Sequence, residues 1–346
     1  MDTTVGLAQA AGPVHSLLTI HAVGTLILVE SVIVAASAQA LDIQGHRGAR
    51  GLAPENTLPA FARALSIGVT TLELDCAITR DDVVVVSHDR VLNPDLTRGP
   101  DGKWLARPGP RIRDLTYEEL LRYDVGRVNP ASAYASRWQA QEAADGARIP
   151  RLTDVFELTH KARNQNVRFN IETKISPLAP EETVGPEEFA RQLTAVVERA
   201  GMSGRTSIQS FDWRTLQWVQ THARGVATVY LTVVGEQDDN IEAQKPVAAW
   251  TAGRHVRDFG GSVPRLVQAS GGAVWSPFHG NLTRDLVRKA HALDLKVIVW
   301  TINEPSDMQR LIEWGVDGMI SDRPDILRRV AGEKGLPLPQ PTPVVH

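Results

Sequence analysis

The chain has 346 residues, 42% of them hydrophobic, which is enough to bury one large core or two small ones. Thirty-seven Lys and Arg residues stand against forty Asp and Glu residues, and the basic residues are dispersed, so a nucleic-acid partner is not expected. Cys76 is the only cysteine, which excludes an intramolecular disulfide framework and a zinc cluster held by thiolates.

The first 40 residues are typical of an export signal. Apolar runs between residues 17 and 36 lead into SAQA, whose alanines fit a small-residue cleavage site. We therefore exclude residues 1–40 from the folded domain and expect a periplasmic or secreted protein. This export signal is atypical, because no Lys or Arg precedes position 47 and Glu30 interrupts the apolar stretch. A membrane anchor is the alternative, but the uninterrupted run is shorter than the ~18 residues of a spanning helix, so stable membrane insertion is not expected.

Eight short apolar segments bounded by turn residues predict strands: residues 43–45, 71–77, 168–173, 206–210, 227–233, 273–276, 296–302 and 318–321. Stretches with helical periodicity lie between most of them, at residues 57–68, 151–163, 212–223, 282–293 and 305–315. Their predicted N-caps are Thr57, Thr153, Asp212, Thr283 and Ser306. Strands and helices alternating in this number predict an α/β fold, the (β/α)8 or TIM barrel, which needs ~250 residues.

Two segments break this alternation. DDVVVVSHD follows the second strand and predicts a short extra strand after a turn. Residues 93–150 are rich in Gly, Pro and Arg and too long for an ordinary connection, so we expect an insertion over one mouth of the barrel. The barrel domain is expected to span residues 41–332, and the Pro-rich tail, residues 333–346, to be extended and poorly ordered.

The second predicted strand carries two acids on one face. In TTLELDCAI, Leu72, Leu74 and Cys76 share one face, whereas Glu73 and Asp75 share the other. On an antiparallel sheet the two acids would simply face water. In a barrel, helices cover the outer face and the inner face points into the interior or its mouth, where an unpaired carboxylate is costly. Two inward acids therefore predict a bound cation.

The next barrel strand adds a third carboxylate. In VRFNIETKI the inward face carries Asn170, Glu172 and Lys174. Three carboxylates without a cysteine cluster predict an oxygen-rich site for Mg²⁺ or Ca²⁺. Zinc is less favoured, but His46 and His88 lie nearby and keep it as an alternative. Taken alone, Lys174 could be only a salt-bridge partner of Glu172, and His88 only a hydrogen-bonded imidazole of the core.

The stretch GHRGARGLAPENT follows the first strand, at the end of the barrel where catalytic groups lie in this fold. An imidazole pair beside a metal ion can supply a general base and a general acid, here His46 and His88. Arg47 and Lys174 can hold an anionic phosphoryl group. The reaction that needs all of these groups together is cleavage of a phosphoester.

Four stretches in this order carry a family resemblance: GHRGARGLAPENT, ELDCAITRDDVVVVSHD, IETK and KVIVWTINEPSDMQRLIEWGVDGMISDRPDIL. Over roughly residues 42–330 the chain resembles the glycerophosphodiester phosphodiesterases, a family of phospholipase-C-like TIM barrels. The resemblance implies a small insertion at residues 93–150 and one divalent cation, Ca²⁺ or Mg²⁺. It also implies hydrolysis of a small-molecule glycerophosphodiester, such as glycerophosphocholine or glycerophosphoethanolamine, to sn-glycerol 3-phosphate and an alcohol.

The family motifs assign roles to matching residues. They imply His46 and His88 as the acid–base pair, Glu73, Asp75 and Glu172 as metal ligands, Arg47 and Lys174 as phosphate contacts, and Trp300 as a substrate-site residue. Glu55 and Asn56 match the motif as supporting residues. Trp300 could equally serve barrel packing, and Gln209, inward on its strand, is a further substrate-site candidate. Asp82 stands where the family has a turn glycine.

Two other functions remain open at this stage. A phospholipase-type relative would act on lysophospholipids or inositol lipids and would need a lipid-facing apolar rim, for which residues 93–150 are too polar. A non-catalytic binding protein could use the same barrel, because fold alone does not fix function. The set of acids, histidines and cations argues against that last alternative.

Overall fold

The computed structural model describes residues 40–345. The predicted export signal therefore lies outside the described residues, apart from Ala40. In the described part of the chain, no helix has both the length and the apolar character needed to cross a bilayer.

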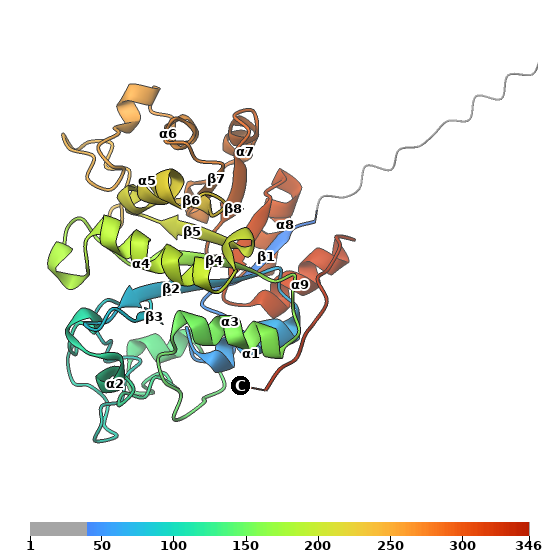
Figure 1. Cartoon of the computed structure of the whole chain (residues 1–346). Coiled ribbons are helices and arrows are strands. Elements are labelled where there is room, and N and C mark those ends of the chain that lie inside the picture. The colour runs from blue at the N-terminus through green and yellow to red at the C-terminus, as the bar shows by residue number, and fades with distance from the viewer. Residues whose placement is uncertain (1–39, 346) are drawn as a thin grey trace, which may run out of the picture. The chain divides into compact units, whose positions relative to one another are not determined.

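Eight parallel strands close into a barrel, as predicted (Figure 1). Neighbouring strands follow the chain order β1, β2, β4, β5, β6, β7, β8 and β9, and β9 pairs back with β1. Their bounds are β1 Asp42–Gly45, β2 Thr71–Ile78, β4 Arg168–Thr173, β5 Thr206–Ser210, β6 Ala227–Thr232, β7 Val274–Pro277, β8 Lys296–Val299 and β9 Gly318–Ser321. The largest difference from prediction is at β8, which ends three residues early, although Ile302 still donates its backbone N–H to the Ile320 carbonyl.

Helices surround the strands (Figure 1). Their bounds are α1 Leu58–Ile67, α2 Tyr117–Leu120, α3 Leu152–Lys161, α4 Pro186–Arg199, α5 Trp213–His222, α6 Val263–Ala269, α7 Arg284–His291, α8 Pro305–Trp314 and α9 Pro324–Glu333. All five predicted helices are present, as α1, α3, α5, α7 and α8, and the structure adds the other four.

Three of the five predicted N-caps are confirmed. The side chains of Thr57, Asp212 and Thr283 each accept a backbone N–H from the first turn of the following helix. The other two predictions are wrong. Helix α3 is capped at Arg151 rather than Thr153, and α8 starts with Pro305 after Glu304 rather than after Ser306. Proline suits the first helical position because its missing N–H would have no helical partner there.

The extra strand after β2 is confirmed as β3, Val84–Val86, which pairs antiparallel with β2. The turn before it places Asp82 at φ 61°, in the left-handed region that glycine adopts freely and that aspartate tolerates better than most residues. The turn therefore forms without the glycine that the family has at this position.

Residues 93–150 contain little regular structure beyond α2 and two short 3-10 helices, η1 (Ile112–Asp114) and η2 (Ala133–Arg137). The segment packs around an apolar cluster of its own, separate from the main core. The buried members of this cluster are Ala77, Val85, Leu92, Ile112, Leu120 and Ile149. The insertion is thus anchored on Ala77 and Val85, which lie on the same face of the β2–β3 pair as Glu73 and Asp75.

The C-terminal tail is irregular, but the expectation of poor order is wrong. Thr342 donates its backbone N–H to the Leu65 carbonyl over 2.8 Å, and Arg328 donates to the Pro339 carbonyl. Leu336, Leu338 and Val344 pack against the main core. The apolar residues between the prolines thus find partners on the barrel's outer surface.

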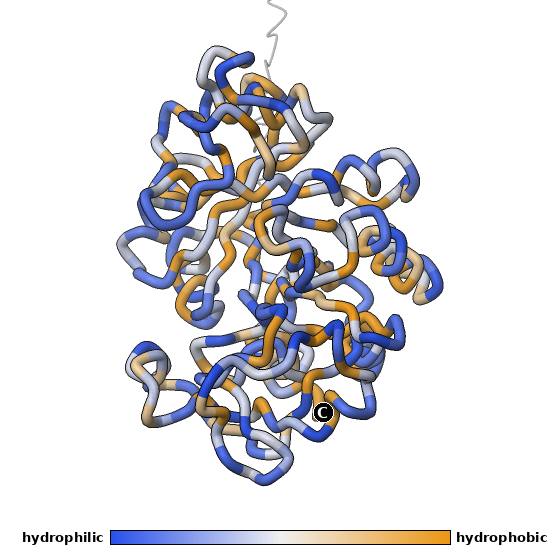
Figure 2. Tube along the Cα trace, turned by 90° about the vertical axis from the view of Figure 1, so that its left-hand side faces the viewer, coloured by the Kyte–Doolittle hydropathy of each residue, from blue (hydrophilic) through white to orange (hydrophobic). Residues whose placement is uncertain are grey.

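The main core lies between the strands and the surrounding helices. Hydrophilic residues follow the outer loops, and hydrophobic ones concentrate along the inner segments (Figure 2). On β4, Phe169 is fully buried and packs edge-to-face on Phe156 of α3, with ring centroids 4.8 Å apart. This contact fixes the outer face of the strand that carries Asn170 and Glu172 on its inner face.

We expect Phe169→Ala to lower the free energy of unfolding by about 3–5 kcal/mol, because it removes a buried ring and leaves a cavity. Urea unfolding of the wild type and the variant measures this loss. Phe169→Leu serves as the control and should cost less, because it refills most of the space. A loss below about 1 kcal/mol for Phe169→Ala would show that the surrounding side chains of the core close the cavity.

Candidate active site

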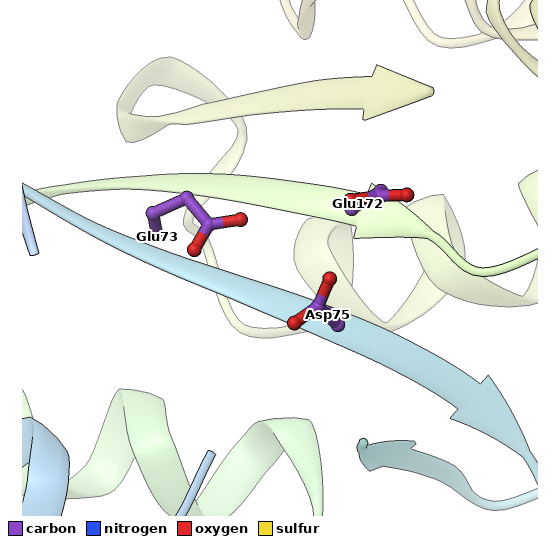
Figure 3. A group of neighbouring side chains, drawn as sticks. All are labelled: Glu73, Asp75 and Glu172. Atoms are coloured by element: carbon purple, nitrogen blue, oxygen red, sulfur yellow. The ribbon is translucent and has the colours of Figure 1, made fainter. Parts of the chain in front are cut away.

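Three buried acids converge at the C-terminal end of the barrel strands (Figure 3). Glu73 and Asp75 come from β2, and Glu172 comes from the end of β4. The strand register pairs Asp75 directly with Glu172. One carboxylate oxygen of each residue lies within 4.8 Å of the other two, so the predicted convergence of the acids is confirmed.

The site fits a hard divalent cation. The Asp75 Oδ1 atom is buried and accepts no hydrogen bond from the described residues, and its nearest cation, Lys174 Nζ, lies 3.8 Å away. Such an orphaned buried oxygen is costly unless something positive binds it. Carboxylate oxygens without sulfur or a coordinating imidazole are the donors that Mg²⁺ and Ca²⁺ prefer.

The crowding of negative charge changes the pKa values of the acids. Burial raises the pKa of Glu172 to about 7. The charge of Lys174 lowers this pKa, and the charge of Asp75 raises it further. Burial also raises the pKa of Glu73 well above its usual range, and the charge of Asp75 adds to the effect. Without a bound cation, the site therefore favours retaining protons on these glutamates.

Two buried cations border the acids. Lys174 Nζ donates to Glu172 Oε1 over 2.7 Å. Arg47 Nε lies 3.4 Å from Asp75 Oδ2 but donates no hydrogen bond within the described residues, and Arg47 Nη1 donates to Glu55. Lys174 is therefore a salt-bridge partner of Glu172, and it lies close enough to Asp75 to face the centre of the site as well.

His46 is held by a carboxylate that the sequence analysis missed. Its Nδ1 lies 2.6 Å from Asp322 Oδ1, and its Nε2 lies 3.9 Å from Glu73 Oε2. Arg50 and Asn303 donate to the same Asp322 carboxylate. Because an ionised carboxylate only accepts hydrogen bonds, Nδ1 carries the proton and the Nε2 lone pair faces the acids. Burial lowers the pKa of His46 to about 4, with Arg50 adding to the shift.

His88 has a similar partner. Its Nδ1 lies 2.8 Å from Asp89 Oδ1, and Asn93 donates to the other oxygen of Asp89. Burial lowers the pKa of His88, and the charges of Arg47 and Lys174 lower it further. The His88 side chain is 32% exposed and lines a cleft together with Glu172 and Lys174, so it is not the core imidazole of the alternative interpretation.

The two supporting residues of the GHRGARGLAPENT stretch contact the site directly. Asn56 Nδ2 donates to Asp75 Oδ2 over 2.9 Å. Glu55 accepts from Arg47 and, over 2.7 Å, from the hydroxyl of Tyr134 in η2. Tyr134 was not predicted, because it lies in the irregular insertion, where periodicity carries no information about partners.

Trp300 and Gln209 occupy different surroundings. Trp300 lines a cleft of about 630 Å³ with His88, Glu172 and Lys174, and it also packs edge-to-face on Phe211. The packing contact is confirmed, and the role of Trp300 in a substrate site stays a prediction. Gln209 is 1% exposed and lies outside the residues that line this cleft. Its Nε2 donates to Glu73 Oε1 over 2.7 Å, so it contacts an acid rather than the open cleft where a substrate contact was expected.

Comparisons with known proteins agree with this geometry. Residues 46–326 match the model of the glycerophosphoryl diester phosphodiesterase family. A glycerophosphodiester phosphodiesterase of Caldanaerobacter subterraneus is 28% identical over 291 residues, covering 84% of this chain and 97% of that protein. A Silicibacter pomeroyi crystal structure that carries the same family name superposes with a TM-score of 0.77 at 33% identity, covering 86% and 95% of the two chains. An Oleispira antarctica phosphodiesterase, solved with its product sn-glycerol-3-phosphate, has the same fold, with a TM-score of 0.61 at 21% identity over 85% of this chain and 97% of that one.

We expect the affinity for Mg²⁺ or Ca²⁺ to rise by about tenfold or more per pH unit below pH ~7, because the ion must displace a proton from Glu172, whose pKa is about 7, and from Glu73, whose pKa is also raised. The ordinary pKa of Glu172 is 4.5, so the folded state holds more protons between pH 4.5 and about 7. Without the ion, the free energy of unfolding should therefore fall as the pH rises from about 4.5 to about 7.

Titration calorimetry at several pH values measures the affinity, and urea unfolding in chelator measures the stability. Glu157→Gln, which alters an exposed glutamate on α3, is the matched control and should keep the same pH dependence. An affinity that stays constant across this pH window would contradict the raised pKa of Glu172.

Proposed function

Because the chain belongs to the glycerophosphoryl diester phosphodiesterase family and is a phosphoric diester hydrolase, we propose that it hydrolyses glycerophosphodiesters with one divalent cation as cofactor. The products would be sn-glycerol 3-phosphate and an alcohol, and glycerophosphocholine and glycerophosphoethanolamine are the first substrates to test. The observation that carries this proposal is the convergence of Glu73, Asp75 and Glu172 within 4.8 Å, beside two buried cations and two histidines.

Glu73, Asp75 and Glu172 would hold the cation, Ca²⁺ or Mg²⁺. A hard divalent cation bound there supplies Lewis-acid chemistry: it polarises a phosphate oxygen and lowers the pKa of a hydroxyl group. Arg47 Nε, a buried donor without a hydrogen-bond acceptor in the described residues, is available to a second phosphate oxygen. Lys174 balances the charge that develops on the phosphoryl group.

The two histidines divide the proton transfers. His46 has a pKa near 4 and directs the Nε2 lone pair at the acids, so at neutral pH it is a base for the attacking hydroxyl, whether of water or of the substrate's own glycerol. His88 is partly exposed and can take up a proton from solvent, and Asp89 stabilises the resulting imidazolium. We assign His88 as the acid that protonates the departing alcohol.

This assignment is tested by two alanine variants and two substrates, one with an alkyl alcohol and one with an acidic nitrophenol as leaving group. His46→Ala should lower kcat by about 10²–10⁴-fold on both substrates. His88→Ala should lower it comparably only on the alkyl substrate, because a nitrophenolate departs without a proton. His222→Ala on the outside of α5 is the control and should stay within about twofold of wild type. Equal losses on both substrates for His88→Ala would remove it from the acid role.

An exposed apolar rim favours a second candidate substrate. Leu178 after β4 and Val247 after β6 are 66% and 68% exposed, and Val234 on the same β6 loop is 44% exposed. Single exposed apolar side chains are ordinary, but three of the five large ones in the described residues lie on these two loops. The cleft between the loops is lined by apolar residues, Ile175, Leu178, Phe211, Val233, Trp250 and Trp300, and by the acids Glu236, Asp238, Asp239 and Glu242 of the loop after β6. These loops lie outside residues 93–150, the polar segment that disfavoured a lipid-type substrate on sequence alone.

We infer that the cleft also accepts a lysophospholipid, with the acyl chain lying along this rim and the phosphate beside Lys174. Wild-type protein should release the head-group alcohol from 1-acyl-glycerophosphoethanolamine. The double variant Leu178→Ser/Val247→Ser should lose at least about fivefold on this substrate and less than about twofold on glycerophosphoethanolamine. Leu121→Ser on the insertion is the control and should change neither rate. No release from the acylated substrate, or an unchanged rate ratio in the double variant, would rule out this second function.

A further inference from the structure

The interior of the barrel contains an unusual set of polar residues. Interiors of this fold are filled mainly by branched apolar side chains. Here three amides with at most 1% exposure lie inside the barrel: Gln44 of β1, Asn170 of β4 and Gln209 of β5. The strand register pairs Asn170 with Glu73 and Gln209 with Glu172. Buried amides are costly unless each polar atom finds a partner, so their contacts indicate what they are for.

The amides form one continuous hydrogen-bonded chain that ends at a proposed metal ligand. Gln209 Nε2 donates to Glu73 Oε1 over 2.7 Å, and Gln209 Oε1 accepts from Asn170 Nδ2 over 2.9 Å. Asn170 Nδ2 also donates to Gln44 Oε1 over 3.0 Å, and Gln44 Nε2 donates to Asp42 Oδ2 over 3.0 Å. The chain thus runs from Asp42, at the start of the strands, to Glu73.

The direction of these hydrogen bonds is fixed by the two ends. Asp42 and Glu73 only accept hydrogen bonds in their ionised form, which is the form of Glu73 that binds a cation. In that form each glutamine must turn its amino group toward its carboxylate and its carbonyl toward the centre. Both carbonyls then meet the amino group of Asn170, which supplies one N–H to each. The carbonyl of Asn170 accepts from Ser207 Oγ over 2.9 Å, which holds the central amide in this orientation.

Glu73 differs from Asp75 in how firmly it is held. Its Oε1 accepts from Gln209 and its Oε2 accepts from the backbone N–H of Arg47 over 2.8 Å, whereas Asp75 Oδ1 accepts no hydrogen bond from the described residues. Glu73 also lies one inward position earlier on β2 than Asp75 (Figure 3). Both contacts hold the Glu73 carboxylate in one orientation and leave lone pairs on each oxygen for a cation.

We propose that Gln209 and Asn170 are positioning residues for the divalent cation: Gln209 orients the Glu73 carboxylate, and Asn170 fixes the amide orientation of Gln209. This inference rests on the proposed function, in which Glu73 is a ligand of the ion. Hydrogen-bond partners of metal ligands commonly change metal affinity by 10- to 100-fold when they are removed.

Two isosteric substitutions separate orientation from packing. Gln209→Glu keeps the shape but places an acceptor against Glu73, so the two carboxylates repel each other. Asn170→Asp removes the central donor, so Gln209 must turn its amino group inward and present its carbonyl to Glu73. Gln220→Glu is the matched control, because that amide donates to Thr228 and Tyr230 on the outer side of the barrel.

The experiment measures the dissociation constants of Mg²⁺ and Ca²⁺ by titration calorimetry on full-length protein, with circular dichroism and Tm recorded for each variant. We expect 10- to 100-fold weaker binding for Gln209→Glu and at least about tenfold weaker binding for Asn170→Asp, with Gln220→Glu within twofold of wild type. Gln209→Leu, which removes the donor without adding charge, should lose about tenfold and serves if the acidic variants do not fold.

A double-mutant cycle tests whether Asn170 changes the affinity for the ion through Gln209. If Asn170 acts through Gln209, then Asn170→Asp/Gln209→Leu should bind the ion as tightly as Gln209→Leu alone. Folded variants at Gln209 that bind either ion within threefold of wild type, or a lowered Tm with unchanged affinity, would overturn the inference. A wild-type protein that binds neither ion would overturn the proposed cofactor and this inference together.

Discussion

Repulsion among three buried carboxylates is the constraint on which the rest of the site depends. Two unit charges about 4 Å apart repel by about 4 kcal/mol even at an effective dielectric of ~20, and a whole domain is stable by only about 5–15 kcal/mol. Glu73, Asp75 and Glu172 therefore cannot all be ionised unless positive groups surround them. Lys174 and Arg47 supply part of that compensation and Asn56 and Gln209 donate hydrogen bonds, but Asp75 Oδ1 has no donor among residues 40–345. The remaining negative potential is what a divalent cation would neutralise.

The barrel makes this arrangement possible because it is rigid on its outer side. Helices α3 and α4 and the large side chains beneath them hold β2 and β4 in the register that pairs Asp75 with Glu172. Polar groups can then occupy the inner face of the strands, because the apolar side chains on the outer face hold the strands in place. The two histidines are also held by fixed neighbouring groups. Each is fixed through Nδ1 by a carboxylate, Asp322 or Asp89, which is itself held by an asparagine.

The sequence predicted the strands and the three acids because both depend on local periodicity. Once the fold is a closed barrel, alternation along β2 and β4 decides which side chains point inward, and Glu73, Asp75 and Glu172 follow. Asp322 was missed because its partner His46 lies 276 positions away, although its place directly after β9 is where this fold carries catalytic groups. Alternation placed Gln209 on the inner face of its strand but did not give its depth inside the barrel. Its contact with Glu73, rather than with the open cleft, could therefore not be predicted. The C-terminal tail was expected to be poorly ordered because it is rich in proline. The apolar residues between the prolines instead pack against the barrel.

Space around the acids is unequal on the two sides of His88. On the insertion side, a cavity of about 40 Å³ lies beside Glu55, Asn56 and His88, which is room for a few water molecules. On the side of the loops after β4 and β6 the cleft holds about 630 Å³. A phosphodiester has an organic group on each side of its phosphorus, and only the cleft can take the larger one. Under the proposed function, the phosphate would then lie between Lys174 and Arg47, with the bulky group directed toward Trp300 and the loops after β4 and β6. The unequal space therefore restricts how a substrate can lie across the carboxylates, independently of which head group it carries.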